Sequence, residues 1–179
     1  MEIKQGWLTS ASICVSSHFN ERPLDSVIDL IVIHNISLPP GKFGADNIKD
    51  FFSGQLDATQ DPYFETIKNL QVSAHLLIDR AGEVTQFVPF DKRAWHAGKS
   101  SWKGRDDCND FSIGIELEGS DDIAFTDNQY AQLLAVIALL KQVYSAITNS
   151  RIVGHSDIAP GRKTDPGPCF DWTKIRQSL

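Results

Sequence analysis

The sequence predicts an α/β (α+β) protein in which a central mixed β-sheet is flanked by helices. Residues 27–35 form a near-continuous apolar, largely β-branched run, which is typical of a central strand buried on both faces. Residues 71–79 and 84–89 predict two strands that pair as a hairpin around a glycine-containing turn. Residues 126–144 carry the apolar spacing of a long amphipathic helix.

The N-terminal part is expected to hold little regular structure outside the first strand. Residues 1–26 contain polar clusters and a proline and are predicted to be irregular, with His18 on the surface. A short helix is predicted over 46–52, with Asp46 as its N-cap. Residues 53–69 are predicted to be a loop with one helical turn.

Residues 111–119 predict a fourth strand with strict alternation. We expect one face to be apolar and the other to be wet, as in many half-buried strands. Two acids beside a glycine on the wet face leave room for a ligand. The apolar face holds Ile113, Ile115 and Leu117, and the polar face holds Ser112, Gly114, Glu116 and Glu118.

The remaining elements are assigned packing or loop roles. His75, within the second strand, is interpreted as a core or supporting residue rather than a third histidine ligand. Residues 93–102 form a loop with two tryptophans, which is typical of sugar stacking and equally of loops fixed to a core. Thr126 is expected to cap the long helix, and residues 171–176 to form a short closing helix.

Composition limits the partner classes. The 179 residues contain 41% hydrophobic and 22% charged side chains, which are ordinary globular values, and we expect residues 1–179 to form a single domain. Seventeen Lys and Arg against 23 Asp and Glu give a net charge of -6, with no basic stripe. Nucleic acid and anionic membranes are therefore not expected partners.

Three cysteines, Cys14, Cys108 and Cys169, are widely spread and form no CxxC pair. Neither a disulfide framework nor a cysteine zinc site is expected, and reduced thiols fit a cytosolic protein. The N-terminus lacks a secretory signal pattern, and no apolar run approaches the roughly 20 residues of a membrane span. We therefore expect a cytoplasmic protein.

The segment 154–168 concentrates an imidazole, carboxylates and cations among three prolines and three glycines. This composition predicts a stiff loop rather than a regular helix or central strand. A polar surface turn would have the same composition. His34, at the end of the strand 27–35, favours a functional site over a surface turn. His155 also follows an apolar strand, and strand ends carry functional groups in α/β sheets.

Zinc hydrolases commonly use two histidines and a carboxylate, with a fourth position open. His34, His155 and Asp165 would supply such a set. The sequence contains neither an HExxH helix nor the PCxxC of cytidine deaminases, so a different type of zinc hydrolase is indicated.

Four stretches of the chain carry a specific resemblance: IVIHNISLPPGKFG, VSAHLLIDRAGEVTQFVPFDKRAWHAG, CNDFSIGIELEG and GHSDIAPGRKTDPGPCFDW. Together they resemble the zinc-dependent N-acetylmuramoyl-L-alanine amidases (amidase type 2), a family that includes phage T7-type lysozyme and peptidoglycan recognition proteins. The chain is most similar to the cytoplasmic 1,6-anhydro-N-acetylmuramoyl-L-alanine amidase branch, from about Gly6 to Trp172. The resemblance implies the amidase and peptidoglycan-recognition-protein fold.

The resemblance implies that His34, His155 and Asp165 bind one Zn2+ ion, with Asp165 where phage-type relatives have cysteine. It also implies catalytic roles for Glu116, where phage-type relatives rely on tyrosine, and for Lys163. Zinc lowers the pKa of its water from 15.7 to about 7. Glu116 can take a proton from that water and pass it to the leaving amine. Lys163 can hold the developing oxyanion.

The implied reaction is hydrolysis of the amide between the lactyl group of (1,6-anhydro-)N-acetylmuramic acid and L-alanine, in peptidoglycan recycling. Asn35 and Trp95 are the expected contacts to the muropeptide substrate, and a monomer is expected. Members of this branch often carry arginine where this chain has Gln71 and Asp107, which changes part of the expected polar recognition.

Two other functions fit the same motifs. A lytic amidase would act on intact peptidoglycan, and phage lysins can also lack a signal sequence. A non-catalytic muropeptide-binding module would be expected to lose a zinc ligand, whereas all three candidates are present here.

Overall fold

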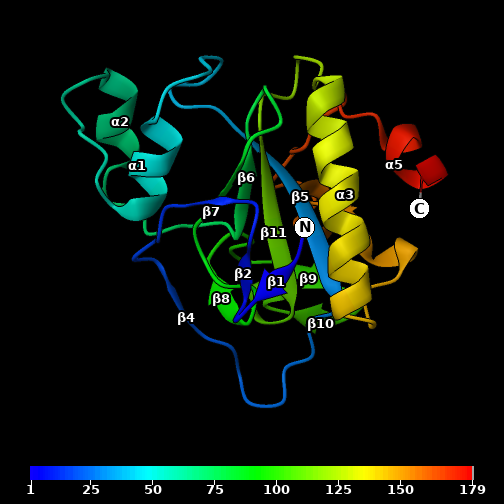
Figure 1. The fold of residues 1–179 in the computed structure, drawn as a ribbon. Coiled ribbons are helices and arrows are strands. Elements are labelled where there is room, and N and C mark those ends of the chain that lie inside the picture. The colour runs from blue at the N-terminus through cyan, green and yellow to red at the C-terminus, as the bar shows by residue number, and fades with distance from the viewer. Residues whose placement is uncertain (179) are drawn as a thin grey trace.

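A six-stranded mixed β-sheet forms the centre of the computed structural model, which describes residues 1–178 (Figure 1). Strand β5 is parallel to both of its neighbours, β11 is parallel to β6, and β7 returns antiparallel to β6. The predicted α/β class with a mixed sheet is therefore confirmed. In spatial order the strands are β12 (Ile152–Gly154), β5 (Leu30–Ile36), β11 (Ser112–Glu118), β6 (Leu76–Ile78), β7 (Val84–Gln86) and β3 (Ser12–Ile13).

Strand β5 is buried on both faces, as its sequence predicts. Ile31 and Ile33 belong to the core beneath the long helix, whereas Leu30 and Val32 belong to a cluster on the opposite face. Because side chains alternate along a strand, His34 lies on the face shared by Leu30 and Val32. The polar end of β5 is therefore directed away from the main core.

Helix α3 (Asp127–Val143) covers one face of the sheet, and α5 (Trp172–Ser178) contacts it (Figure 1). The Thr126 side chain accepts from the backbone N–H of Gln129 at 3.1 Å. The Gln129 side chain in turn accepts from the backbone N–H of Thr126 at 3.0 Å. This reciprocal capping box confirms the predicted helix start.

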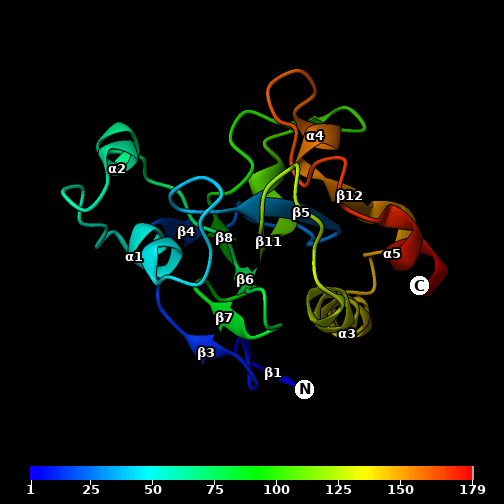
Figure 2. The same ribbon diagram turned by 90° about the horizontal axis from the view of Figure 1, so that it is seen from above.

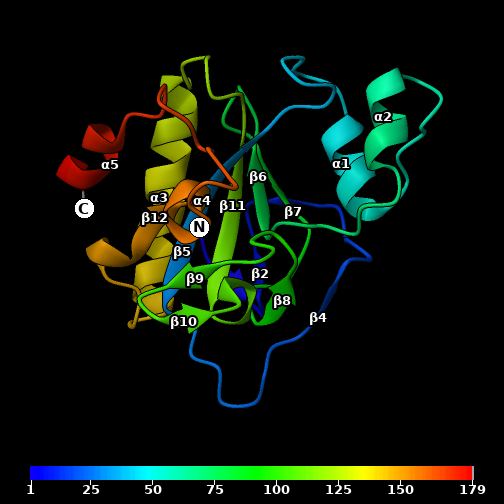
Figure 3. The same ribbon diagram turned by 180° about the vertical axis from the view of Figure 1, so that it is seen from behind.

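Helices α1 (Asn47–Ser53) and α2 (Pro62–Ile67) form a lobe on the side of the sheet away from α3 and α5 (Figures 2 and 3). The predicted helix and helical turn are both present. Asp46 is the N-cap residue of α1, as predicted, but its carboxylate binds Lys49 at 2.8 Å and makes no capping hydrogen bond to a backbone N–H. Asp61 provides the side-chain cap of α2 by accepting from the backbone of Tyr63.

The prediction of irregular structure over residues 1–26 is wrong. Strands β1 (Ile3–Lys4) and β2 (Trp7–Leu8) pair with each other, and β3 joins the sheet beside β7. Strand β4 (Phe19–Glu21) pairs with β8 (Lys92–Ala94). The partners of β3 and β4 lie about 70 residues away in the sequence, so their pairing leaves no local hydrophobic pattern.

The remaining short elements belong to the segments that connect the main strands and helices along the chain. They are β9 (Ser101–Trp102), β10 (Arg105–Asp106), the 3-10 helices η1 (Cys108–Asp110) and η2 (Asn149–Arg151), and α4 (His155–Ile158). Cys14, Cys108 and Cys169 are free thiols. Within residues 1–178, none of the helices combines the length and apolar character that crossing a bilayer requires.

The predicted wet face of β11 is wrong, because all seven residues of the strand are buried. Its polar face is covered by other parts of the chain. Ser112 contacts His96 at 3.1 Å, and the Glu118 carboxylate accepts from the backbone N–H groups of Gly44 and Arg80 at 2.6 and 3.2 Å. The alternation therefore separates an apolar core from a buried polar layer.

His75 belongs to this buried layer, as predicted. Its Nδ1 accepts from the backbone N–H of Gly114 at 3.0 Å, and its Nε2 donates to the carbonyl of Lys92 at 3.1 Å. Both ring nitrogens are thereby bonded to main-chain groups, and the Arg22 guanidinium also lies 3.2 Å from Nε2. His75 is a packing residue of the sheet. His18, predicted to be on the surface, is half-buried, and its Nδ1 lies 3.2 Å from the carbonyl of Val72.

Candidate metal and active site

Three parallel strands deliver the candidate site residues to one edge of the sheet. His34 lies near the carboxyl end of β5, and Glu116 is its direct partner in the β11 ladder. His155 follows Gly154, the last residue of β12. Because parallel strands end at the same edge, these side chains meet although they are far apart in the sequence.

The segment predicted to be a loop begins with one helical turn, α4, so this part of the prediction is wrong. The Asp157 carboxylate accepts from the backbone N–H of Gly154 at 2.8 Å and stabilises the start of the turn. All three prolines of the segment lie beyond the turn, where they do not interrupt it. The chain then returns, and the carbonyl of Asp165 accepts from the N–H of Ser156 at 3.0 Å.

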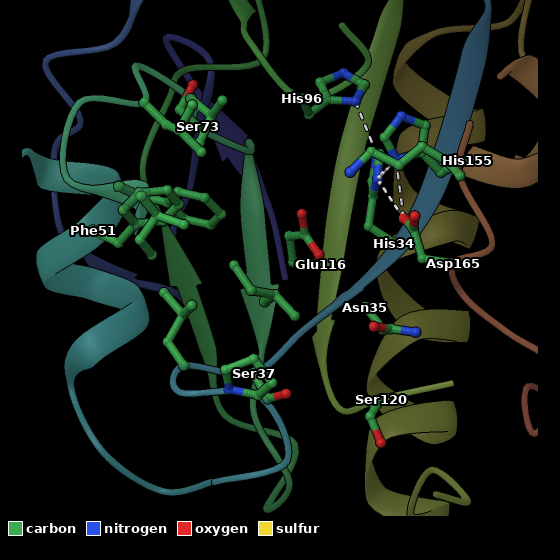
Figure 4. Close-up of a pocket in the computed structure, with 18 of the residues that line it drawn as sticks. His34, Asn35, Ser37, Phe51, Ser73, His96, Glu116, Ser120, His155 and Asp165 are labelled. Carbon is green, nitrogen blue, oxygen red and sulfur yellow. Dashed lines mark hydrogen bonds and ion pairs between the residues drawn. The ribbon is translucent and has the colours of Figure 1, made fainter. Parts of the chain in front are cut away.

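This return brings the three predicted metal ligands together (Figure 4). The Nδ1 atoms of His34 and His155 are 3.0 Å apart. Asp165 Oδ2 lies 3.1 Å from the first and 3.0 Å from the second. Ligand atoms around a tetrahedral zinc ion, with bonds of about 2.0–2.1 Å, lie about 3.3 Å apart. Two imidazole nitrogens and a carboxylate oxygen in this arrangement fit a zinc ion.

The protonation of these groups also suits a metal ion. Burial lowers the pKa of His34 to about 4, so its ring is neutral near pH 7. Burial alone would raise the pKa of Asp165, but the close contacts with the imidazoles of His155 and His34 hold it well below its usual range. A neutral imidazole and a carboxylate are the forms that bind metal.

His155 is oriented from its far side. Its Nε2 lies 3.0 Å from the carbonyl oxygen of Ala97. A carbonyl only accepts hydrogen bonds, so Nε2 carries the proton and Nδ1 keeps its lone pair toward Asp165. This is the second contact that metal-binding histidines in proteins usually make.

Glu116 projects into the space beside the three ligands (Figure 4). Only 8% of the residue is exposed, and its Oε2 has no hydrogen-bond partner within residues 1–178. Burial raises the pKa of Glu116 well above its usual range, the nearby Asp165 carboxylate raises it further, and the Lys163 ammonium opposes both. A buried carboxyl group with a free oxygen can exchange a proton with a ligand in this space.

The space is a cavity of about 420 Å³ with two different walls. The wall formed by strand ends carries the three ligands, Glu116 and the exposed Lys163. The opposite wall is apolar and comes mainly from the α1–α2 lobe, where Figure 4 shows Phe51. Its side chains are Leu38, Phe51, Phe52, Tyr63, Ile67 and Leu70.

Both predicted substrate contacts line this cavity. Asn35 donates from Nδ2 to Asp121 Oδ1 at 2.7 Å, which fixes the amide at the rim. The Trp95 indole donates from Nε1 to Asn20 Oδ1 at 2.8 Å, and its ring stacks on His18 with centroids 6.2 Å apart. The indole is therefore held in place before any ligand binds.

Gln71 and Asp107 do not line the main cavity. Gln71 borders a smaller cavity together with Trp95 and Arg162, and Asp107 borders a separate one near Lys99.

Sequence reasoning missed His96 and Asp121. His96 lies within residues 93–102, where the sequence gives no sign of a metal site, yet its Nδ1 lies 2.9 Å from Nε2 of His34. The signal that could have found it is Gly114. A Cβ atom at position 114 would lie 2.3 Å from the His96 ring, and a glycine inside a strand often marks such a close approach.

Comparison with known proteins places these observations in a family. A family model described as N-acetylmuramoyl-L-alanine amidase matches residues 24–168. The chain is 56% identical over 176 residues to the 1,6-anhydro-N-acetylmuramyl-L-alanine amidase AmpD of Citrobacter freundii, covering 98% of this chain and 94% of the relative.

Two solved structures extend the comparison. The crystal structure of a Se-Met AmpD derivative superposes with a TM-score of 0.97 at 55% identity, covering 100% of this chain and 99% of that chain. The N-acetylmuramyl-L-alanine amidase AmiD from E. coli has been solved in complex with the substrate anhydro-N-acetylmuramic acid-L-Ala-D-gamma-Glu-L-Lys. It superposes with a TM-score of 0.62 at 29% identity, covering 90% of this chain and 65% of that chain.

Proposed function

The chain belongs to the N-acetylmuramoyl-L-alanine amidase family, and from this premise we propose that it acts on muropeptides that carry 1,6-anhydro-N-acetylmuramic acid. The bond hydrolysed is the amide between the lactyl group of the sugar and L-alanine of the stem peptide, and the role is in peptidoglycan recycling. The observation that carries this proposal is the near-full-length identity of 56% to an enzyme of that name. The convergence of two imidazoles and a carboxylate at one cavity supports it independently.

The metal site of this reaction consists of His34, His155 and Asp165, which hold one zinc ion. Their donor atoms are 3.0–3.1 Å apart, and family members depend on zinc in general. A bound zinc ion supplies Lewis acidity and makes a water molecule acidic enough to attack an amide at neutral pH. Asp165 contributes the negative charge that balances part of the charge of the ion.

Glu116 is the general base and acid. It removes a proton from the attacking water and delivers it to the nitrogen of L-alanine as the amide breaks. Its unpaired Oε2 and its position beside His34 in the ladder support this role. Burial favours the protonated carboxyl group that forms halfway through the reaction.

Lys163 stabilises the negative charge that develops on the carbonyl oxygen. It lies two residues before Asp165, it lines the cavity, and its ammonium is close enough to influence Glu116 and His34. A single well-placed donor of this kind contributes roughly 3–4 kcal/mol to a transition state. Because its side chain is exposed, Lys163 can move toward the oxyanion when substrate binds.

Asn35 and Trp95 contact the muropeptide. The Asn35 amide presents a polar group beside the metal ligands, and the fixed Trp95 indole presents a flat surface for a sugar ring. The complex of E. coli AmiD with an anhydro-muropeptide gives a related example of such a substrate. Gln71 borders a smaller cavity that shares Trp95, His155 and Lys163 with the main one, whereas Asp107 lies at a separate cavity.

Residues 1–179 are proposed to form one amidase domain, with Leu179 outside the described residues. The N-terminal strand β3 and the C-terminal helix α5 both join the layers that contain the site, which supports one folding unit. A monomer is proposed because one chain supplies every site residue. Three free thiols support a reducing compartment, and the cytoplasm is proposed.

Mass spectrometry of the products from purified anhydro-muropeptide and from intact sacculi, measured in parallel, tests the function. The proposal expects release of free stem peptide and anhydro-sugar from the first substrate at a much higher rate. Preferred release from sacculi would identify a lytic amidase instead. Binding of muropeptide without any product would identify a recognition module, although the presence of all three ligands argues against that outcome.

A further inference from the structure

A chain of hydrogen bonds connects the main chain at Cys108 with the metal-facing imidazole of His34. Ser112 Oγ lies 2.6 Å from the carbonyl oxygen of Cys108 and 3.1 Å from His96 Nε2. His96 Nδ1 lies 2.9 Å from His34 Nε2. The other nitrogen of His34, Nδ1, faces His155 and Asp165.

The direction of every bond in this chain follows from its first member. A carbonyl oxygen cannot donate, so the single Ser112 proton is directed to Cys108. Ser112 Oγ must then accept from His96, which places a proton on His96 Nε2. In a neutral ring the His96 Nδ1 accepts, and the proton between the two rings belongs to His34 Nε2. The Nδ1 of a neutral His34 is thereby left with its lone pair toward the metal site.

The neutral form of His96 is supported by its surroundings. The residue is 9% exposed and forms no ion pair with a carboxylate in the described structure. Among residues 1–178 its ring nitrogens contact the Ser112 hydroxyl and the His34 ring, and neither of these groups is an anion that would hold a second proton on His96. His96 therefore has no proton to offer His34 from Nδ1.

The position of His96 is fixed by backbone features on both sides. Gly114 leaves the space that the ring occupies, since a Cβ there would come within 2.3 Å of it. Asn109 Oδ1 accepts from the backbone N–H groups of His96 and Ala97 at 3.0 and 2.8 Å. The same anchored pair also presents the Ala97 carbonyl to His155.

We propose that His96 is a positioning residue that holds His34 in the Nε2-protonated tautomer, and that the anchored pair His96–Ala97 orients both imidazole ligands. The inference rests on the proposed metal site. It assigns His96 no contact with substrate. The proposal gives a role to the buried His96 and to Gly114, which makes room for its ring, although neither residue is one of the three proposed ligands.

The tautomer of His34 can be read directly in the metal-free protein. Long-range 1H–15N correlation spectra distinguish a protonated Nε2 from a protonated Nδ1, and competition with a zinc-binding dye measures the Kd for zinc. In the wild type we expect His34 protonated on Nε2. In His96→Leu we expect a mixture of tautomers and zinc binding weakened about 10–100-fold, the usual effect of losing such a contact.

His96→Asn tests rescue, because its amide oxygen can take the place of Nδ1 as the acceptor. We expect it to regain most of the zinc affinity and the Nε2-protonated form. His75→Asn is the matched control, since His75 is equally buried but bonds only main-chain groups and Arg22. It should lower the midpoint of thermal unfolding and leave the zinc Kd of the folded protein unchanged.

Unchanged tautomer and zinc Kd in His96→Leu would overturn the inference. If that variant does not fold, Ser112→Ala removes the acceptor of His96 together with the hydrogen bond to the Cys108 carbonyl, leaves both rings in place and is measured in the same way. A mixed tautomer at His96 and His34 then supports the relay, and wild-type spectra refute it. Failure of the wild type to bind zinc would overturn the proposed metal site, whereas the spectra of the metal-free protein would still test the relay.

Discussion

Glu116 of β11 lies directly opposite His34 of β5 in a parallel ladder. Partners in such a ladder are about 4.8 Å apart and project from the same face of the sheet. The proposed base and the first proposed metal ligand are therefore placed by main-chain hydrogen bonds rather than by a loop. Both side chains are buried, which keeps the separation constant.

Replacing Glu116 by glutamine tests the role of the base. Glu116→Gln keeps the size of the side chain but removes its ability to take a proton, so we expect kcat to fall about 10²–10⁴-fold. Zinc content, measured by metal analysis, should remain at one ion per chain. Glu118→Gln is the neighbouring control, because Glu118 binds the backbone of Gly44 and Arg80 and should affect stability more than turnover. Wild-type turnover in Glu116→Gln would exclude it as the base.

Removal of zinc should abolish hydrolysis, and added zinc should restore it. Since a metal that binds only the folded state stabilises it, the midpoint of thermal unfolding should also rise with zinc concentration. Calorimetry of Asp165→Ala provides the matched measurement, and we expect no rise in that variant. Hydrolysis that survives complete removal of metal would contradict the proposed mechanism.

Lys163→Met should lower kcat about 10²–10³-fold with little change in the overall fold, because it removes one donor to the oxyanion. Lys163 is exposed, so no core contact is lost. Lys141 at the end of α3 lies on the other side of the sheet, and Lys141→Met serves as the control of equal charge change. An equal rate in the two variants would show that Lys163 does not stabilise the transition state.

The central strand, the hairpin, the long helix and the convergence of His34 and His155 could be predicted because each has a local signal. Residues 27–35 are apolar throughout, Thr126 and Gln129 form a capping box, and His34 and His155 each follow an apolar run. The resemblance of whole motifs added the proposed roles of Glu116 and Lys163, which alternation alone could not supply.

The errors concern contacts between distant segments. Strands β3 and β4 depend on partners about 70 residues away, and the polar face of β11 is covered by the segment that contains His96. Hydrophobic alternation shows that two faces of a strand differ, but it does not show whether the polar face meets water or a buried polar layer. Similarly, the prolines of 154–168 predict a loop but do not forbid the single turn α4 that precedes them.

Gly114→Ala should disturb the site without touching a metal ligand. The added methyl would lie 2.3 Å from the His96 ring, so either the ring or the strand must move. Overpacking of this kind costs about 1–3 kcal/mol, and we expect a lower free energy of unfolding in urea. The displaced His96 should also weaken zinc binding. At Gly161 a Cβ would meet nothing within 4 Å, but φ is +76°, so Gly161→Ala should lose stability through backbone strain alone and keep its zinc affinity. A fully stable Gly114→Ala protein would contradict the packing described.

The buried His75 should make the stability of the metal-free protein depend on pH. Burial and the Arg22 cation lower the pKa of His75 to about 3, whereas an unfolded histidine has a pKa of about 6.5. Between these values the unfolded chain binds a proton that the folded chain does not. The free energy of unfolding should therefore fall as the pH falls below about 6.5, by about 1.4 kcal/mol per pH unit from this residue. Above pH 6.5 His75 does not contribute to the pH dependence of the free energy of unfolding.

Urea unfolding of the metal-free protein at pH 7.5, 6.5 and 5.5 measures this dependence. The pKa of His34 is lowered to about 4, so this residue should also lower the free energy of unfolding as the pH falls from 6.5 to 4. Asparagine at position 75 does not titrate, so His75→Asn should be less stable at pH 7.5 but lose less stability on acidification than the wild type. If both proteins lose the same free energy between pH 6.5 and 5.5, His75 is not held in the neutral form by the fold.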